Sequence, residues 1–180
     1  RGLGDVYKRQ LLILITVLAP VIAPYNPLEA VMRDANGAPS AAHLFGTDKL
    51  GRDVLSRILY GASYSLTSVL FLVFLIFVVG TFLGVIAGYF GGIVDTVIMR
   101  FADMMISFPG VILAIAIAGI LGGSLVNAMI AMLCVTWTKY ARLSRSMVLK
   151  IKKRDFVDAA IVSGGSSAHI LWVHILPNIL

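Results

Sequence analysis

The chain has 180 residues, of which 59% are hydrophobic and only 13% carry a charge. A soluble domain of this length cannot bury so much apolar surface, so the composition indicates an integral membrane protein that has lipid as its main solvent. The net charge of +6 could suit nucleic acid, but the basic residues gather beside apolar runs and form no stripe with interleaved aromatic residues. No nucleic acid is therefore expected as a partner. The single cysteine, Cys134, allows neither an intrachain disulfide nor a cysteine-based metal site.

The amino-terminal residues 1–10, RGLGDVYKRQ, lack an initiator methionine, and we interpret them as a non-native leader to be left out of fold reasoning. Residues 11–23 are apolar but fall short of the roughly 20 residues that a membrane span needs. They are interpreted as the remnant of a first transmembrane helix, closed by Pro20 and Pro24. A cleavable signal peptide is the alternative, which no small-x-small cleavage site behind a basic leader supports.

Residues 24–64 form a polar interval in which positive and negative side chains balance. It ends in the stretch GTDKLGRDVLSRILYGASYSL, which starts at Gly46. The spacing predicts local ion pairs among four residues: Asp48, Arg52, Asp53 and Arg57. Gly46 and Gly51 permit turns, and Asp53 can cap the helix that follows. Taken alone, the stretch is interpreted as a solvated, self-neutralised loop that leads into a helix.

Three transmembrane helices, the second to the fourth of the chain, are predicted in residues 65–138. Ser65–Phe90 is uncharged and long enough, at about 1.5 Å per residue, to cross a hydrocarbon layer of roughly 30 Å. A glycine-rich turn divides the later uncharged run into helices at Met104–Leu121 and Leu125–Trp137, which should form a tight hairpin.

Small residues on these helices mark faces that another helix can approach closely. The expected helix-packing positions are Gly80, Gly84, Gly88, Ala114 and Ala118. Pro109 has two open interpretations: it kinks its helix, as in helices that line a transport path, or it is tolerated near a helix start.

The densest basic run of the chain extends from Lys139 to Arg154. The positive-inside bias therefore places residues 139–177 on the cytoplasmic side of the membrane. Counting the spans backwards puts residues 24–64 on the outer side. Trp137 and Tyr140 should anchor the fourth helix at the interface.

The segment from Phe156 to Asn178, FVDAAIVSGGSSAHILWVHILPN, is expected to be exposed to water and to contact a partner protein, unlike the apolar residues before it. A short apolar helix carries Asp158, Ala159 and Ala160, and a break follows at Gly164 and Gly165, where glycine can take the left-handed conformation. A second short amphipathic helix leads to Pro177, which suits the first turn of a fifth transmembrane helix starting at residues 178–180. The pattern predicts a helix-elbow-helix knob that fits a groove.

This segment resembles the cytoplasmic loop of the permease subunits of ABC importers, which reads E-A-A, three residues, G, nine residues, I-x-L-P. Asp158-Ala159-Ala160, Gly164 and Leu176-Pro177 have the matching spacing, with Asp158 in place of Glu and His174 in place of Ile. The ending from His174 to Asn178 resembles the dipeptide, oligopeptide and nickel branch. The stretch predicted on the outer side resembles a second signature of that branch, at Gly46, Thr47, Asp48, Gly51, Arg52, Asp53, Ser56 and Arg57.

The resemblance implies a C-type permease subunit with a type I-like helical bundle, truncated at both ends because family members continue through further spans. It implies that an ATPase docks at Asp158, Ala159, Ala160, Gly164 and Gly165. The implied partners are a sister permease, two cytoplasmic ATPases that bind ATP and Mg, and an extracytoplasmic substrate-binding protein. The implied activity is import of dipeptides or oligopeptides across the bacterial inner membrane by alternating access, with nickel as the alternative cargo.

The sequence contains no GxxxxGK[ST] loop, HExxH or GxSxG motif, so no catalytic residue, resident metal or cofactor of its own is expected. Its histidines are not at metal-ligand spacing, and His169 and His174, five residues apart, should lie on different faces of a helix. An ion-coupled secondary transporter is a rival function, but the apolar runs lack the ionisable residues that it needs at mid-membrane. A membrane scaffold is a further alternative that the composition does not exclude.

Overall fold

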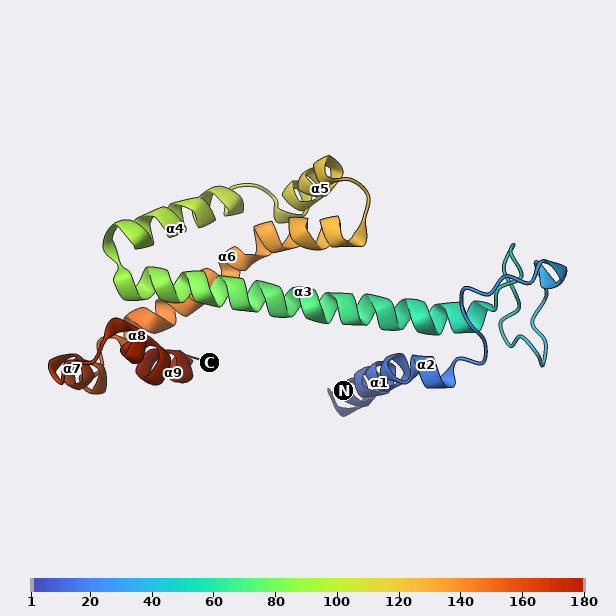
Figure 1. The fold of residues 1–180 in the computed structure, drawn as a ribbon, viewed down its shortest axis with the longest axis horizontal. Coiled ribbons are helices and arrows are strands. Elements are labelled where there is room, and N and C mark those ends of the chain that lie inside the picture. Colours follow the sequence, from blue (N-terminus) through green and yellow to red (C-terminus); the bar gives the residue numbers. More distant parts are fainter. Residues whose placement is uncertain (1, 180) are drawn as a thin grey trace. The chain divides into compact units, whose positions relative to one another are not determined.

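The protein is mainly helical, and a computed structural model describes the backbone of residues 2–179 and the side chains of residues 6–8, 10, 11 and 13–179 (Figure 1). It forms two compact units, residues 1–71 and 72–180, and the boundary between them falls inside the long helix α3 (Val54–Phe90). No strand forms within residues 2–179, where Thr47 and Asp53 make one isolated bridge. The predicted all-α fold is confirmed.

The first unit begins with two helices, α1 (Gly2–Val17) and α2 (Ala19–Ile22). Pro20 lies in the first turn of α2, where a residue without an N–H group breaks no hydrogen bond. Helix α1 begins at Gly2, so the apolar residues predicted to be the remnant of a first transmembrane helix continue a helix that starts within residues 1–10. The non-native origin of residues 1–10 stays a prediction.

The loop between α2 and α3 contains one short 3-10 helix, η1 (Met32–Asp34), and is shaped by two left-handed glycines. A Cβ atom added at Gly46 would lie 2.4 Å from the carbonyl oxygen of Gly37, and one at Gly51 would lie 1.8 Å from that of Val31. The positive φ angles and the close backbone both require glycine at these two positions.

Helix α3 starts at Val54, well before the predicted start of the second span at Ser65. The reason is the cap: the Asp53 carboxylate accepts the backbone N–H of Ser56 at 2.7 Å, which satisfies an otherwise unpaired donor of the first turn. The apolar span is therefore the continuation of a helix that begins in the polar loop.

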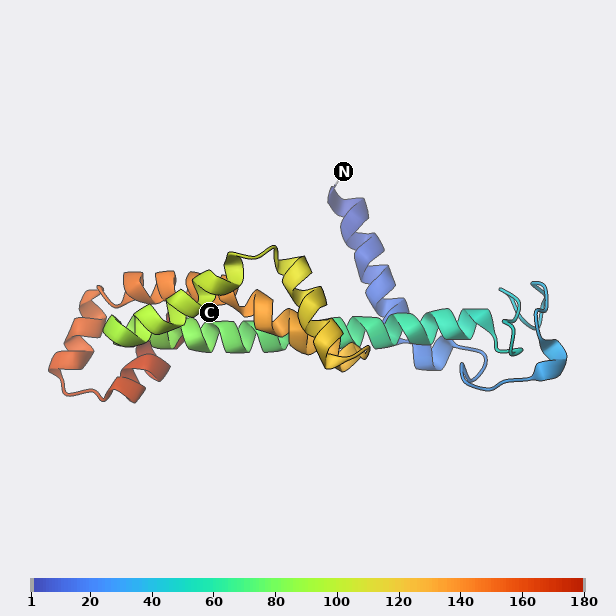
Figure 2. The same cartoon turned by 90° about the horizontal axis from the view of Figure 1, so that it is seen from above.

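The second unit continues from the end of α3 through short and long helices (Figures 1 and 2). They are α4 (Gly92–Ile106), α5 (Gly110–Leu121), α6 (Leu125–Ile151), α7 (Asp155–Val162), α8 (Ser167–His169), the π-helix η2 (Ile170–Ile175) and α9 (Leu176–Ile179).

The predicted third helix, Met104–Leu121, is divided in the structure between the end of α4 and the whole of α5. Helix α4 already starts at Gly92, after a corner at Gly91 and Gly92 that both have positive φ. It ends at Ile106, and α5 leaves at an angle of 92° after Pro109. Proline removes a backbone donor and disfavours the helical conformation of the residue before it, so the chain breaks here. Of the two interpretations of Pro109, the structure places it at a helix start, directly before the first residue of α5.

The predicted hairpin between the third and fourth helices forms between α5 and α6. Ser124 caps α6 by accepting the N–H of Asn127 at 3.1 Å. The Asn127 side chain donates to the carbonyl oxygens of Leu121 at 2.7 Å and Gly122 at 3.1 Å, which joins the end of α5 to the start of α6. This pairing fixes a tight turn.

Two boundaries in the carboxyl-terminal third differ from the prediction. Helix α6 does not end near Trp137 but runs to Ile151, so residues 139–151 of the predicted loop are helix, and only residues 152–154 and 163–166 of that loop lie outside helices. The chain is also helical from Ser167 to Ile179 without interruption, so no separate helix starts at Pro177. Pro177 is tolerated inside this helical segment because the wider turn of the π-helix η2 comes directly before it.

The glycine stripe of α3 faces α6. A Cβ added at Gly80 would lie 2.6 Å from the carbonyl oxygen of Trp137, and one at Gly84 would lie 2.2 Å from that of Ala141. At Gly88 it would meet Val148 at 2.9 Å. The two backbones approach so closely only because α3 carries no side chain at these positions.

Ion pairs tie α4 to α6. The Asp95 carboxylate accepts two hydrogen bonds from Arg145, each 2.5 Å long, in the bidentate geometry that suits guanidinium. Asp103 pairs with Arg142 one turn earlier on α6. Four charges that the sequence presents as loop residues therefore connect two helices.

Helix α3 is the single helix within residues 2–179 that is long and apolar enough to cross a bilayer by itself. Helices α4 and α5 reach that length only as a bent pair, and α6 carries its basic residues inside the helix. Of the three predicted spans, the described residues thus hold one continuous helix of spanning length and one bent pair, and a multi-pass arrangement stays a prediction.

Candidate functional site

The elbow after α7 is a Schellman motif, in which the last turn of a helix closes through a left-handed residue. Gly165 donates its N–H to the carbonyl oxygen of Ala160 at 3.0 Å, and Gly164 donates to that of Ile161 at 3.0 Å. Gly164 has φ +80°, and a Cβ at Gly165 would lie 2.9 Å from the Ala160 oxygen. The two glycines therefore set the direction in which the chain leaves α7.

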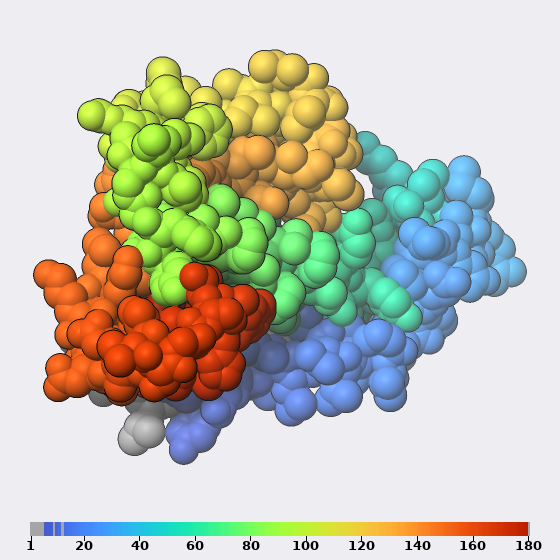
Figure 3. All heavy atoms as spheres, turned by 60° about the vertical axis from the view of Figure 1, so that its left-hand side comes forward, coloured from blue at the N-terminus to red at the C-terminus, as the bar shows by residue number. Residues whose placement is uncertain are grey.

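A small apolar core lies beneath this elbow. Val157 of α7, Val148 of α6 and Ile175 of η2 are fully buried there, together with Val85 of α3 and Ile170. Figure 3 shows the carboxyl-terminal residues packed against the later part of α3. Helix α7 is thus a packed element and not a free loop.

A further contact fixes the junction between α6 and α7. The Lys152 ammonium donates to the carbonyl oxygen of Tyr89 at 2.7 Å, near the end of α3, and lies 5.4 Å from the Tyr89 ring centroid. A cation at a helix carboxyl terminus is favoured by the helix dipole. The contact joins the ends of α3 and α6 directly before α7 starts.

The outer face of α7 has no partner in the described part of the chain. Asp158 and Ala159 are exposed, and Val162, one turn later, is 88% exposed. The Asp158 carboxylate has no ion pair among residues 2–179. Ala160 differs from its neighbour, because it is half-buried and packs on the core. The structure thus places Asp158 and Ala159 outward, and Ala160 at the base of the segment.

The prediction that His169 and His174 lie on different faces is wrong. Their ring centroids are 5.7 Å apart. The cause is the π-helix η2, where the N–H of Leu176 donates to the carbonyl oxygen of Leu171, five residues earlier. In a π-turn, residues five apart come together, and nothing in the residue pattern distinguishes such a turn from an α-helix.

The two histidines border an open groove of about 370 Å³ beside α7. Its walls are Phe156, Ala159, Ala160, Ser163, Gly165, His169 and His174. The groove therefore joins both predicted alanines to the elbow and to the histidines that the sequence reasoning had set aside.

The second predicted site, in the loop before α3, is a local network. The Asp48 carboxylate accepts a hydrogen bond of 2.8 Å from Arg52 and pairs with Arg57 as well. Asp53 does not pair with an arginine, contrary to one predicted pairing, because its second oxygen lies 3.0 Å from Nδ1 of His43. Ser56, which Asp53 caps, accepts the N–H of Tyr25 through its hydroxyl at 3.2 Å.

These contacts explain the charge states of both acids. Hydrogen bonds from Arg52 hold the pKa of the Asp48 carboxyl well below its ordinary value. Burial alone would raise the pKa of Asp53, but hydrogen bonds from Ser56 and then from His43 outweigh it, so this pKa is lowered too. Both carboxylates serve as fixed anions that organise the loop.

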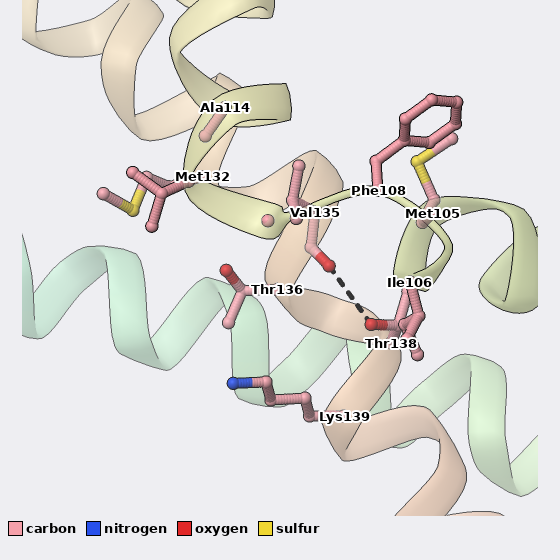
Figure 4. A pocket seen from close by; sticks show the side chains of 11 residues that line it. Met105, Ile106, Phe108, Ala114, Met132, Val135, Thr136, Thr138 and Lys139 are labelled. Atoms are coloured by element: carbon pink, nitrogen blue, oxygen red, sulfur yellow. Dashed lines mark hydrogen bonds between the residues drawn. The ribbon is translucent and has the colours of Figure 1, made fainter.

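A cavity of about 340 Å³ lies where the α4–α5 break faces α6 (Figure 4). Met105 and Ile106 border it from the end of α4, Phe108 from the break, and Ala114 from α5. From α6, Lys139 brings the cavity its single charged side chain. Thr138 contributes a hydroxyl that already donates to the carbonyl oxygen of Val135 at 3.1 Å.

Ala114 is buried and Ala118 half-buried on α5, the helix that packs on α6. Among the side chains that the structure describes, no three His, Cys, Asp or Glu residues converge on one point as in a metal centre with three or more protein ligands.

The long apolar helix, the broken helix pair and the basic helix α6 form a helical bundle of the kind that membrane domains have. Residues 80–180 match the family described as the binding-protein-dependent transport system inner membrane component, and the chain belongs to this family.

Named relatives extend the match over most of the chain. It is 41% identical over 174 residues to the dipeptide transport system permease protein DppC of Haemophilus influenzae, covering 93% of this chain and 59% of the relative. It is 44% identical over 168 residues to DppC of Alkalihalophilus pseudofirmus, with 93% and 55% covered. The glutathione transport system permease protein GsiD of Pectobacterium atrosepticum is 39% identical over 169 residues, with 93% and 56% covered. The chain thus spans somewhat more than half the length of these relatives.

Proposed function

We propose that this chain is part of a multi-pass permease subunit of an ATP-driven importer, and that its cargo is short peptides. The cargo follows from the relatives, which are named for the transport of dipeptides and of glutathione, itself a small peptide. The binding-protein-dependent family implies a separate substrate-binding protein, and a sister permease and two ATPases complete the proposed assembly.

The observation that carries the proposal is the outer face of α7. A short helix rests on a buried core, its direction is set by two glycines, and it presents Asp158, Ala159 and Val162 outward without a partner. A rigid small-residue surface of this kind suits a cleft of another protein, because little side-chain entropy is lost on docking. In the proposed assembly this partner is the ATPase.

The core beneath α7 gives the proposed force path. Val157 contacts a cluster that includes Val85 of α3 and Val148 of α6, and Lys152 links the ends of these helices. A displacement of α7 by the ATPase would therefore move α3 and α6 as packed bodies. Alternating access requires that the ATPase bind α7 with different free energies in the inward-open and outward-open states.

We place the translocation path at the cavity beside the α4–α5 break. Broken helices at membrane depth are tolerated where they line a cavity. This cavity has apolar walls and, where the predicted cytoplasmic segment begins, the Lys139 ammonium. An ammonium in such a position suits the carboxylate that every unmodified peptide carries.

The test is uptake of a radiolabelled dipeptide into proteoliposomes that contain the complete permease pair, its ATPases and the binding protein. Uptake is expected only with ATP, and Ala159→Arg should abolish it while membrane insertion stays normal. We choose Ala159 because Ala160 packs on the core, where arginine would also disturb folding. Uptake driven by an ion gradient without ATP would instead favour a secondary transporter.

A further inference from the structure

The π-helix η2 brings together two imidazoles that an α-helix would separate. In an α-helix each residue turns the chain by about 100°, so side chains five apart point to different sides. The π-turn spans five residues per hydrogen bond and places His169 and His174 one above the other. Their rings are nearly perpendicular, at 78°, with centroids 5.7 Å apart.

This separation is close to what a shared metal ion needs. A tetrahedral Zn²⁺ holds imidazole nitrogens at about 2.0–2.1 Å, which puts the centroids of two rings that share one ion about 5 Å apart. Small rotations about the side-chain bonds would close the remaining gap. Perpendicular rings also meet without an edge-to-edge clash.

Both imidazoles have their nitrogens available. With the side chains that the structure describes, the ring nitrogens of His169 and His174 make no hydrogen bond or ion pair. His43 differs, because Asp53 holds its Nδ1 at 3.0 Å. In the described part of the chain, free ring nitrogens on neighbouring histidines are found only at this pair.

The surroundings also suit a cation. The open groove of about 370 Å³ leaves room for water ligands, and no lysine or arginine lines it. Ser163 brings a hydroxyl group to the wall of the groove. Phe156 lies beside His174, with ring centroids 6.4 Å apart. An aromatic neighbour limits the directions in which the imidazole can turn.

We propose that His169 and His174 form a binding site for a divalent transition-metal ion of the Zn²⁺ class, with water in the other coordination positions. The site exists because η2 is a π-helix, and by linkage the bound ion stabilises this turn against its α-helical alternative. Imidazole is a preferred ligand of Zn²⁺ and Cu²⁺, whereas hard ions such as Mg²⁺ prefer oxygen. The ion would thus bridge α8 and η2, directly behind the elbow.

The test uses the full chain in lipid nanodiscs, purified without a histidine tag, and titration calorimetry with Zn²⁺. Wild type should bind one Zn²⁺ per chain in a saturable reaction, and both His169→Ala and His174→Ala should lose it. His43→Ala is the matched control and should bind as wild type does. Saturable binding that survives either of the first two substitutions would overturn the proposal, as would its absence in the wild type.

A second measurement asks whether both rings bind the same ion. With one equivalent of Cu²⁺, the electron paramagnetic resonance spectrum should show hyperfine splitting from two imidazole nitrogens, and each alanine variant should show at most one. A wild-type spectrum with one coordinated nitrogen would contradict the shared site. Both histidines are solvent-accessible, so neither substitution removes core packing.

Discussion

The close approach of α3 and α6 gives a quantitative prediction for Gly84. An alanine there would place its Cβ 2.2 Å from the carbonyl oxygen of Ala141, whereas ordinary contact begins at 3.4 Å. The neighbouring atom belongs to backbone, so it cannot rotate away, and the two helices must separate by roughly 1 Å or strain. Overpacking of this kind costs about 1–3 kcal/mol of folding free energy.

The assay is thermal unfolding of the purified protein in one fixed detergent. A loss of 1 kcal/mol lowers Tm by about 2–4 °C for a chain of this size, so Gly84→Ala should lower Tm by about 2–12 °C. Gly61→Ala is the matched control on the same helix, since nothing lies within 4 Å of its added Cβ. It should leave Tm unchanged or raise it slightly, because alanine is the better helix former. Equal Tm values for both variants would refute the packing of α6 on the glycine stripe.

Three further predictions concern the elbow, the loop and the α4–α6 ion pair. In Gly164→Ala the added Cβ meets no neighbouring atom, but alanine is strained at φ +80°, so the free energy of unfolding should fall by about 1–2 kcal/mol. Gly164→Pro should lower it further, because the hydrogen bond from the Gly164 N–H to the Ile161 carbonyl oxygen is also lost. Denaturant titration measures both changes. The lowered pKa of Asp48 means that its stabilising contribution is present above the unfolded pKa of about 3.9 and is lost as pH falls below it. Asp48→Asn should therefore lower Tm at neutral pH and flatten the loss of Tm below about pH 4, whereas Glu29→Gln, which removes no ion pair, should leave the profile unchanged. Asp95→Ala should cost about 1–3 kcal/mol by leaving Arg145 unpaired, and a double-mutant cycle with Arg145→Ala should show coupling; additive effects would contradict the pair.

Local signals in the sequence were enough for several features. Asp53 stands directly before an apolar helix, so its role as a cap follows from residue type and position. The paired glycines at 164 and 165 predict the elbow because a left-handed residue ends many helices. The membrane class follows from the lack of charge in long runs.

Features that depend on distant partners could not be predicted. Asp95 and Arg145 are 50 residues apart in sequence, and nothing local shows that α4 lies along α6. The helix at Gly92–Ile106 was not predicted, because its charged residues indicate a loop as long as their partners on α6 are unknown. The π-turn was missed because one extra residue in a helical hydrogen-bond ladder leaves no compositional trace, although it reverses the expected relation of His169 and His174.

The central claim is that the outer face of α7 is where the ATPase docks. The most direct measurement is capture of the ATPase subunits by the affinity-tagged permease pair in nanodiscs, comparing wild type, Ala159→Arg and Ile93→Arg. Ile93, in the first turn of α4, is 83% exposed and receives the same charge away from α7. The account predicts capture by wild type and by Ile93→Arg and its loss in Ala159→Arg. Undiminished capture by Ala159→Arg would contradict it.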